Sequence, residues 1–152
     1  MGKITNDQEL RLALDTLTTD QQRALGALFA QSVAALGNNP RLNKNLDMAM
    51  AADATEHDRE DAYRTAKSIA VKTYTACGRD ADWSAQAEHF VAAACAAALT
   101  PDALITEKQN LAWKAAIQAR MAQNCMMIEN SEGDVENEAV KQYEITEKYL
   151  SA

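Results

Sequence analysis

The stretch WSAQAEHFVAAACAAAL, from Trp83 to Leu99, decides the fold. Six of the last ten residues in it are alanine, and its larger apolar side chains fall on several sides of a helical projection rather than along one stripe. A helix that is apolar nearly all round is buried on most of its sides. Its small side chains would also let neighbouring helices approach closely. We therefore expect this segment to be the central helix of a helical protein.

The rest of the chain also favours helix. Its 152 residues include 31 alanines, but only five glycines and two prolines. Alanine loses no side-chain entropy in a helix, whereas glycine and proline interrupt one. No long segment alternates between apolar and polar residues, as a half-buried strand would. The sequence therefore predicts an all-α fold, with residues 1–152 forming a single domain of six or seven helices in an irregular or orthogonal bundle.

Capping residues indicate where several of these helices begin. Asn6 and Glu9 have the spacing of a capping box, and Thr18 and Thr55 precede further helical repeats. Proline and glycine mark the breaks, at Gly37–Pro40 and at Thr100–Pro101. The predicted helices span roughly 6–17, 19–36, 41–52, 56–77, 83–99, 110–128 and 134–150.

Charge and cysteine content narrow the function classes. A formal net charge of −7 would repel a phosphate backbone, which argues against a nucleic-acid partner. No apolar window approaches the roughly 18 residues of a membrane span. Cys77, Cys95 and Cys125 form no CxxC pair, and the first residues do not resemble a secretory signal. These features predict a soluble protein with reduced thiols in the cytoplasm and no membrane partner.

The segment CGRDADW, from Cys77 to Trp83, raises the possibility of a bound cofactor. A cysteine followed by Arg79, Asp80 and an aromatic residue resembles the chromophore-attachment segment of the phycobiliproteins. That resemblance implies a globin-like helical fold in which Cys77 bonds a bilin, while Arg79 and Asp80 contact its propionates and pyrrole nitrogens. The family keeps this motif inside a helix, whereas Gly78 favours a helix end here. We favour the simpler interpretation, a boundary between two helices.

Two histidines, His57 and His89, suggest a second route to a tetrapyrrole, with one ring on each side of a haem iron. Haem pockets need large apolar and aromatic walls, however. His57 lies in the charged run TEHDRED, and His89 lies among alanines. A helical pocket protein that binds a small cofactor such as a tetrapyrrole remains the alternative. Its candidate ligands are His89, Cys77, Arg79 and Asp80.

Sequence motifs for catalysis or metal binding are absent. The chain has no Glu-x-x-His pair for a di-metal site, no GxSxG and no glycine-rich phosphate loop. Cys95 lies in an apolar run, where a thiol is unreactive. We therefore expect no enzyme activity, no resident cofactor and no metal.

The C-terminal segment, 130–152, is the most acidic part of the chain. Seven acidic residues and two lysines lie between Glu129 and Leu150, which accounts for most of the net charge. Apolar and acidic residues recur there at helical spacing, which predicts an amphipathic helix with an acidic outer face. A basic protein partner would be steered towards it. The candidate partner-binding residues are Glu136, Val140, Tyr143, Glu144, Glu147 and Leu150.

These observations favour a small, non-enzymatic helical protein that acts through protein–protein interaction, as an adaptor, regulator or immunity-type protein. A homodimer is a further alternative, because a second copy packed across a two-fold axis would bury the alanine-rich helix equally well. The interaction hypothesis predicts an exposed apolar patch of several hundred Å².

Overall fold

The computed structural model describes residues 3–37, 40–51, 53–76, 83–105, 109–130 and 138–151. Within these ranges it is all-helical, which confirms the predicted fold class. The α-helices pack into one compact domain. A short 3₁₀ helix, η1, follows α2, and another, η2, lies between α5 and α6. The elements are α1 (Asp7–Asp15), α2 (Thr19–Val33), η1 (Ala34–Gly37), α3 (Pro40–Met50), α4 (Glu56–Ala76), α5 (Trp83–Ala98), η2 (Asp102–Leu104), α6 (Leu111–Asn130) and α7 (Glu138–Ser151).

The predicted caps are present at three helix starts. The Asn6 side chain accepts a hydrogen bond from the backbone N–H of Glu9 at 2.9 Å. Thr18 and Gln21 form a complete capping box at the start of α2. Thr55 accepts from the N–H of Asp58 at 3.1 Å before α4. Each cap satisfies an N–H group that has no partner within its helix, so these starts are fixed by local chemistry.

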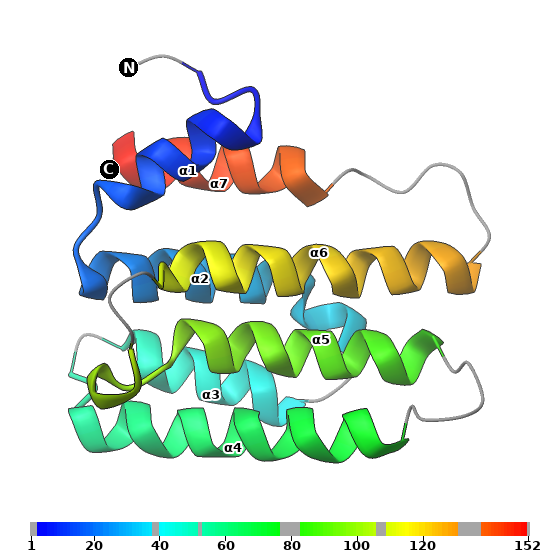
Figure 1. Cartoon of the computed structure of the whole chain (residues 1–152). Helices are drawn as coiled ribbons and strands as arrows, with labels where there is room; N and C mark the ends of the chain where they lie inside the picture. Colours follow the sequence, from blue (N-terminus) through cyan, green and yellow to red (C-terminus); the bar gives the residue numbers. More distant parts are fainter. Residues whose placement is uncertain are drawn as a thin grey trace.

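The helices form three layers (Figure 1). Helices α4, α5 and α6 lie side by side in one layer, with α5 in the middle. Helices α2 and α3 pack against the inner side of that layer, α2 on α5 and α6 and α3 mainly on α4. Helices α1 and α7, from opposite ends of the sequence, lie side by side beyond α6.

The prediction of a buried, alanine-rich central helix is confirmed. Among the described side chains of α5, six are fully buried: Ala87, Val91, Ala92, Ala94, Cys95 and Ala98. Their small side chains let α2 come very close. A Cβ atom placed on Gly26 of α2 would lie 3.2 Å from the Cβ of Ala98 and 3.3 Å from that of Ala115. Any side chain at position 26 would require these neighbours to shift by a few tenths of an ångström, so glycine favours the observed approach.

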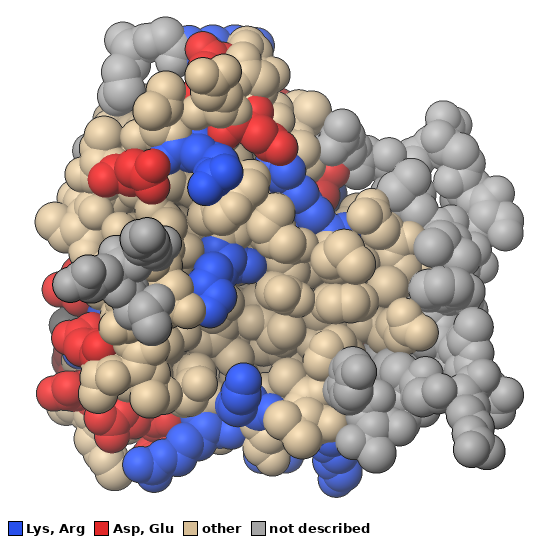
Figure 2. Space-filling model, in the orientation of Figure 1, with Lys and Arg blue, Asp and Glu red and all other residues tan. Residues whose placement is uncertain are grey.

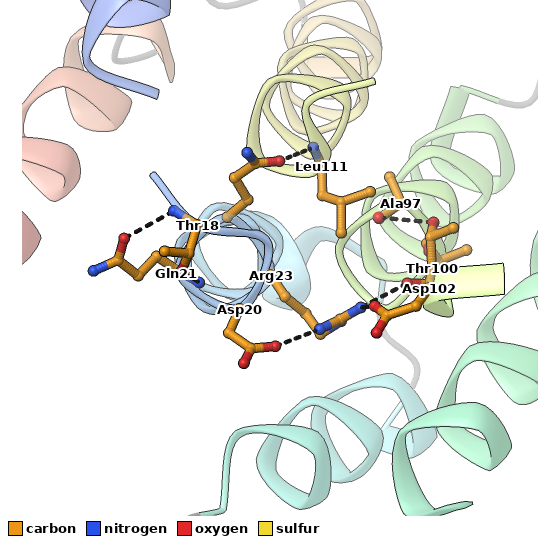
Figure 3. Close-up of polar contacts among 10 residues, drawn as sticks. Thr18, Asp20, Gln21, Arg23, Ala97, Thr100, Asp102 and Leu111 are labelled. Atoms are coloured by element: carbon orange, nitrogen blue, oxygen red, sulfur yellow. Dashed lines mark hydrogen bonds and ion pairs between the residues drawn. The ribbon is translucent and has the colours of Figure 1, made fainter. Parts of the chain in front are cut away.

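A buried arginine fixes α2 against the turn between α5 and α6 (Figure 3). Arg23 donates from Nη2 to the carbonyl of Thr100 at 3.0 Å and to Asp102 at 2.8 Å. Its Nη1 pairs with Asp20 at 3.0 Å. Gln22 accepts from the N–H of Leu111, the first residue of α6, at 3.1 Å. The inner layer thus holds both ends of the α5–α6 connection.

Candidate functional site

The outer side of α5 carries an open groove of about 490 Å³ between α4 and α6. We call it the alanine groove, because Ala93, Ala96 and Ala97 of α5 form its floor. Ala93 is half-buried, and the other two are 7% and 8% exposed. The sequence predicted burial of α5 on most sides. The structure agrees with this and shows that the remaining side, at the half-buried Ala93, borders an open groove.

The walls of the alanine groove come from the two flanking helices. Helix α4 contributes Lys67 and Val71, and α6 contributes Lys114 and Gln118. Leu104 of η2 lies at the end that Arg23 fixes from the inner side. Walls on rigid helices give the groove a defined shape, which is how binding sites are usually preformed.

Large apolar side chains are exposed along both walls. Val71 is 59% exposed and Leu104 is 57% exposed. Ile117 and Met121, at 37% and 40% exposure, follow Lys114 at i+3 and i+7 and so share its side of α6. The sequence pattern places Ile117 and Met121 with the apolar residues of α6 and does not indicate that they face outwards. The sequence does not indicate their exposure because α6 carries apolar residues on several sides.

The charges on this face are cationic. Among the described residues that line the groove, the full charges are those of Lys67 on one wall and Lys114 on the other. Figure 2 shows that the face over α4, α5 and α6 is largely uncharged, with isolated Lys and Arg side chains. Acidic side chains gather towards the N-terminal end of α4 and around α1 and α7. The groove is thus a locally positive region on a protein whose net charge is −7.

His89 of α5 lines the alanine groove, whereas His57 does not. The Nδ1 atom of His89 lies 2.7 Å from the carbonyl oxygen of Ala70, which can only accept, so Nδ1 carries a proton. His57 is 76% exposed near the start of α4 and pairs with Asp61 at 3.3 Å. Since His57 and Ala70 are separated by about 20 Å of helix, the two rings do not face one iron.

The other proposed cofactor ligands, Cys77, Arg79 and Asp80, lie outside the described residues. Of the remaining cysteines, Cys95 and Cys125 are both buried. Burial raises the pKa of the Cys95 thiol to about 12. The thiol therefore carries no appreciable thiolate near neutral pH and is unsuited to nucleophilic chemistry. No cluster of three potential metal ligands occurs among the residues that the structure describes.

The acidic helix α7 packs against the rest of the protein through a row of polar residues. Glu138, Gln142 and Thr146 are its buried residues. Gln142 donates to the carbonyl of Ala116 at 2.9 Å and accepts from Arg120 Nε at 2.8 Å. The hydroxyl of Thr146 donates to the carbonyl of Gln142. These hydrogen bonds explain why polar residues can occupy a buried face, and sequence patterning alone did not indicate them.

Three candidate partner-binding residues of α7 make contacts within the chain. Tyr143 donates to Asp7 at 2.8 Å, Glu147 accepts from the backbone N–H of Ile4, and Leu150 packs against the apolar cluster under α1. The outer side of α7 presents Val140, which is 43% exposed, and the exposed Glu144. Glu136 lies outside the described residues. Of the candidate residues that the structure describes, only Val140 and Glu144 are therefore exposed.

An arginine joins α6 to both terminal helices. Arg120 makes a two-pronged ion pair with Asp7, at 2.8 and 2.9 Å, and its guanidinium lies over the ring of Trp113. The hydrogen bonds from Arg120 lower the pKa of Asp7, an effect that burial partly offsets. Burial, and then the hydrogen bond to Asp7, raise the pKa of Tyr143. These polar and charged contacts thus add to the apolar cluster, with Leu10 and Leu14 of α1 fully buried, that attaches the layer formed by α1 and α7.

Comparison with protein-family models, curated proteins and solved structures finds no match. Within the described part of the chain, no helix is both long enough and apolar enough to cross a membrane. Functional inference therefore rests on the alanine groove and on the outer face of α7.

Proposed function

We propose that this chain is a non-enzymatic protein-binding module and that it contacts its partner through the alanine groove. The observation that carries the proposal is the outer side of α5: a groove with an apolar floor, rigid helical walls and exposed large apolar side chains. Exposed apolar side chains grouped around a groove are typical of interaction sites on soluble proteins. The adaptor, regulator and immunity-type roles all remain compatible with it.

The chemistry around the groove favours binding over catalysis. The Nδ1 proton of His89 is directed to the backbone carbonyl of Ala70. The Cys95 thiol lies in the interior, with its pKa raised by burial. An active site would bring a nucleophile, a base and an anion-stabilising group together, whereas the Thr100 hydroxyl of the groove donates to the carbonyls of Ala96 and Ala97.

The acidic face of α7 is the competing interaction surface. Its exposed residues Val140 and Glu144 suit a basic partner. Val140 is an isolated exposed apolar residue on this helix, whereas Val71 and Leu104 both line the groove, and Ile117 and Met121 lie on the same side of α6 as Lys114. The groove is therefore the stronger candidate, and a cytoplasmic location for this function remains a prediction.

Site-specific photocrosslinking in the native host distinguishes the two surfaces. We would place a benzophenone amino acid at Val71, on the groove wall, or at Val140, on α7, with Lys44 on α3 as an exposed control position. The proposal expects a discrete protein adduct from position 71 that disappears when Ala93→Leu fills the groove. An adduct from position 140 alone would assign the function to α7, and no adduct from either position would contradict an interaction role.

A small-molecule ligand is the second candidate, and one observation favours it. The groove volume lies within the usual range for small-molecule sites, about 300–1,000 Å³, and its lining includes His89 and two lysines that could pair with carboxylates. An ultraviolet–visible spectrum of the purified protein tests a tetrapyrrole directly. A visible band that is lost in His89→Ala would support this candidate. A colourless protein would exclude a co-purified tetrapyrrole.

A further inference from the structure

We propose that the alanine groove binds an amphipathic α-helix of another protein, with small apolar residues on its contact face and acidic residues on both sides of that face. This inference rests on the proposed function, because it specifies the partner of the same groove. Three features carry it: the shape of the groove, the sign of its charges and the way α2 binds the opposite side of the same helices.

The shape of the groove fits a helix. Its walls, α4 and α6, lie alongside α5, so the groove follows the helix axes (Figure 1). From His89 to Thr100 the floor extends about 16 Å, close to three helical turns. An extended peptide usually binds by pairing with the edge of a sheet, and the described residues form no strand. A helix laid between two walls buries its apolar side without needing backbone partners.

The inner side of the same layer shows how such a helix can pack. There α2 lies against α5 and α6, and its Gly26 comes within contact distance of Ala98 and Ala115. Small residues on both sides permit this approach. The outer floor of Ala93, Ala96 and Ala97 offers a similar small-residue surface with no described helix on it. A partner helix with small side chains would therefore pack closely there.

The charges select an acidic partner. Lys67 and Lys114 stand on opposite walls of the groove, and no acid is among the described lining residues. A helix with glutamate or aspartate on both sides of its apolar stripe could pair with both lysines at once. Complementary charges of this kind set specificity and association rate more than total affinity. A basic helix would face two like charges.

The same charges disfavour a second copy of this chain. Two grooves packed face to face across a two-fold axis would present lysines to lysines. The acidic helix α7 is already attached through Glu138, Gln142 and Thr146, and its outer face offers Val140 as its exposed large apolar residue. A partner of different sequence therefore satisfies the groove better than self-association does.

The test uses three fluorescein-labelled synthetic helices of about 15 residues, long enough to cover the floor at 1.5 Å per residue. All share one stripe of alanine and leucine, and the flanking positions are glutamate, glutamine or lysine. Fluorescence polarisation with the full chain measures affinity. We expect the glutamate helix to bind at least about tenfold more tightly than the lysine helix, with the glutamine helix between them.

Charge reversal provides the decisive comparison. In Lys67→Glu/Lys114→Glu the preference should invert in favour of the lysine helix. The control Lys44→Glu/Lys148→Glu changes the net charge equally at exposed positions that do not line the groove, and should keep the original order. Ala93→Leu should weaken all three peptides by at least about tenfold, because it fills the floor. Circular dichroism verifies that each variant remains folded.

The outcomes separate this inference from the proposed function. Equal binding of all three peptides that Ala93→Leu abolishes would leave the groove as a protein-binding site and overturn the acidic partner. No peptide binding, with a groove-specific crosslink from position 71, would overturn the helical partner alone. A glutamate preference that survives Ala93→Leu would place binding elsewhere and overturn the inference. A wild-type dimer that Ala93→Leu dissociates, measured by sedimentation, would replace the partner with a second copy.

Discussion

The two sides of α5 have a similar amino-acid composition, but only one of them is covered by another helix layer. On the inner side, alanines at 94 and 98 are fully buried beneath the inner layer, and α2 approaches at Gly26. On the outer side, alanines at 93, 96 and 97 form the floor of an open groove. The inner surface is buried under α2, whereas the outer surface borders the groove in which we propose that a partner binds. The difference teaches that small apolar residues permit close packing without specifying which helix supplies the other side.

Thiol reactivity should show the largest contrast between the two sides. Cys95 faces the interior with a pKa of about 12, so near pH 8 its thiolate fraction is on the order of a thousandfold below that of an ordinary cysteine. A cysteine introduced on the outer side by Ala93→Cys should react rapidly with iodoacetamide. Mass spectrometry of time points, in a Cys77→Ser/Cys125→Ser background, measures both rates in one molecule.

The control for this contrast is the unfolded chain. In denaturant the two thiols should react at similar rates, because burial no longer separates them. Rapid native alkylation at Cys95 would show that the inner side opens easily. The glutamate peptide should protect the introduced thiol of Ala93→Cys without changing the rate at Cys95.

Enlarging Gly26 should cause the largest loss of stability. In Gly26→Val the added atoms meet Ala98, Ala115 and the backbone of Ala112, for which even a single Cβ is already 3.2–3.4 Å away. We expect the free energy of unfolding to fall by about 3 kcal/mol, the upper part of the usual range for overpacking. Urea denaturation followed by circular dichroism measures it. Gln31→Val, at an exposed position of the same helix, controls for the lower helix propensity of valine.

Two adjacent alanines provide the most direct comparison of the sides. Ala94→Leu inserts three heavy atoms into a fully buried position and should cost about 2 kcal/mol. Ala93→Leu makes the same change at a half-buried position on the groove floor and should alter the free energy of unfolding by less than about 0.5 kcal/mol. Parallel urea titrations of the two variants measure the difference. Equal losses would mean that the outer side is packed as tightly as the inner side.

Acid should have the smallest effect, and it should act on the terminal layer rather than on α5. Arg120 lowers the pKa of Asp7, so this carboxylate stabilises the fold above its unfolded pKa of about 4, and that contribution is lost as pH falls through the lower, folded value. Asp7→Asn should therefore flatten the dependence of unfolding free energy on pH below about 4. Asp15→Asn, on the same helix, is the control. An unchanged slope in Asp7→Asn would show that the ion pair does not stabilise the terminal helices.

Local features of the sequence were sufficient to predict most helix starts. Asn6, Thr18 and Thr55 cap helices as expected because an N-cap bond involves residues only three positions apart. The buried face of α7 could not be predicted in this way. Gln142 is buried because Ala116 and Arg120, on another helix, supply its hydrogen-bond partners. No local pattern contains that information.

The candidate site shows the same division. Sequence reasoning identified α5 as central and singled out His89, but it did not indicate Lys67, Lys114 or the exposure of Ile117 and Met121. These residues come from two helices that flank a third, and their meeting depends on how the layer is assembled. Cys77, Arg79, Asp80 and Glu136 lie outside the described residues, so their proposed roles stay predictions.

The sequence by itself determined that this chain is helical, where several of its helices begin and that α5 lies at the centre. These features follow from capping residues and alanine content, which act over a few residues. Only the tertiary structure decided which side of α5 is covered. An alanine-rich helix has no strong apolar stripe to direct its packing. The covered side is set by Gly26 and Arg23 of α2, which contact α5, α6 and the turn between them at residues more than 70 positions away.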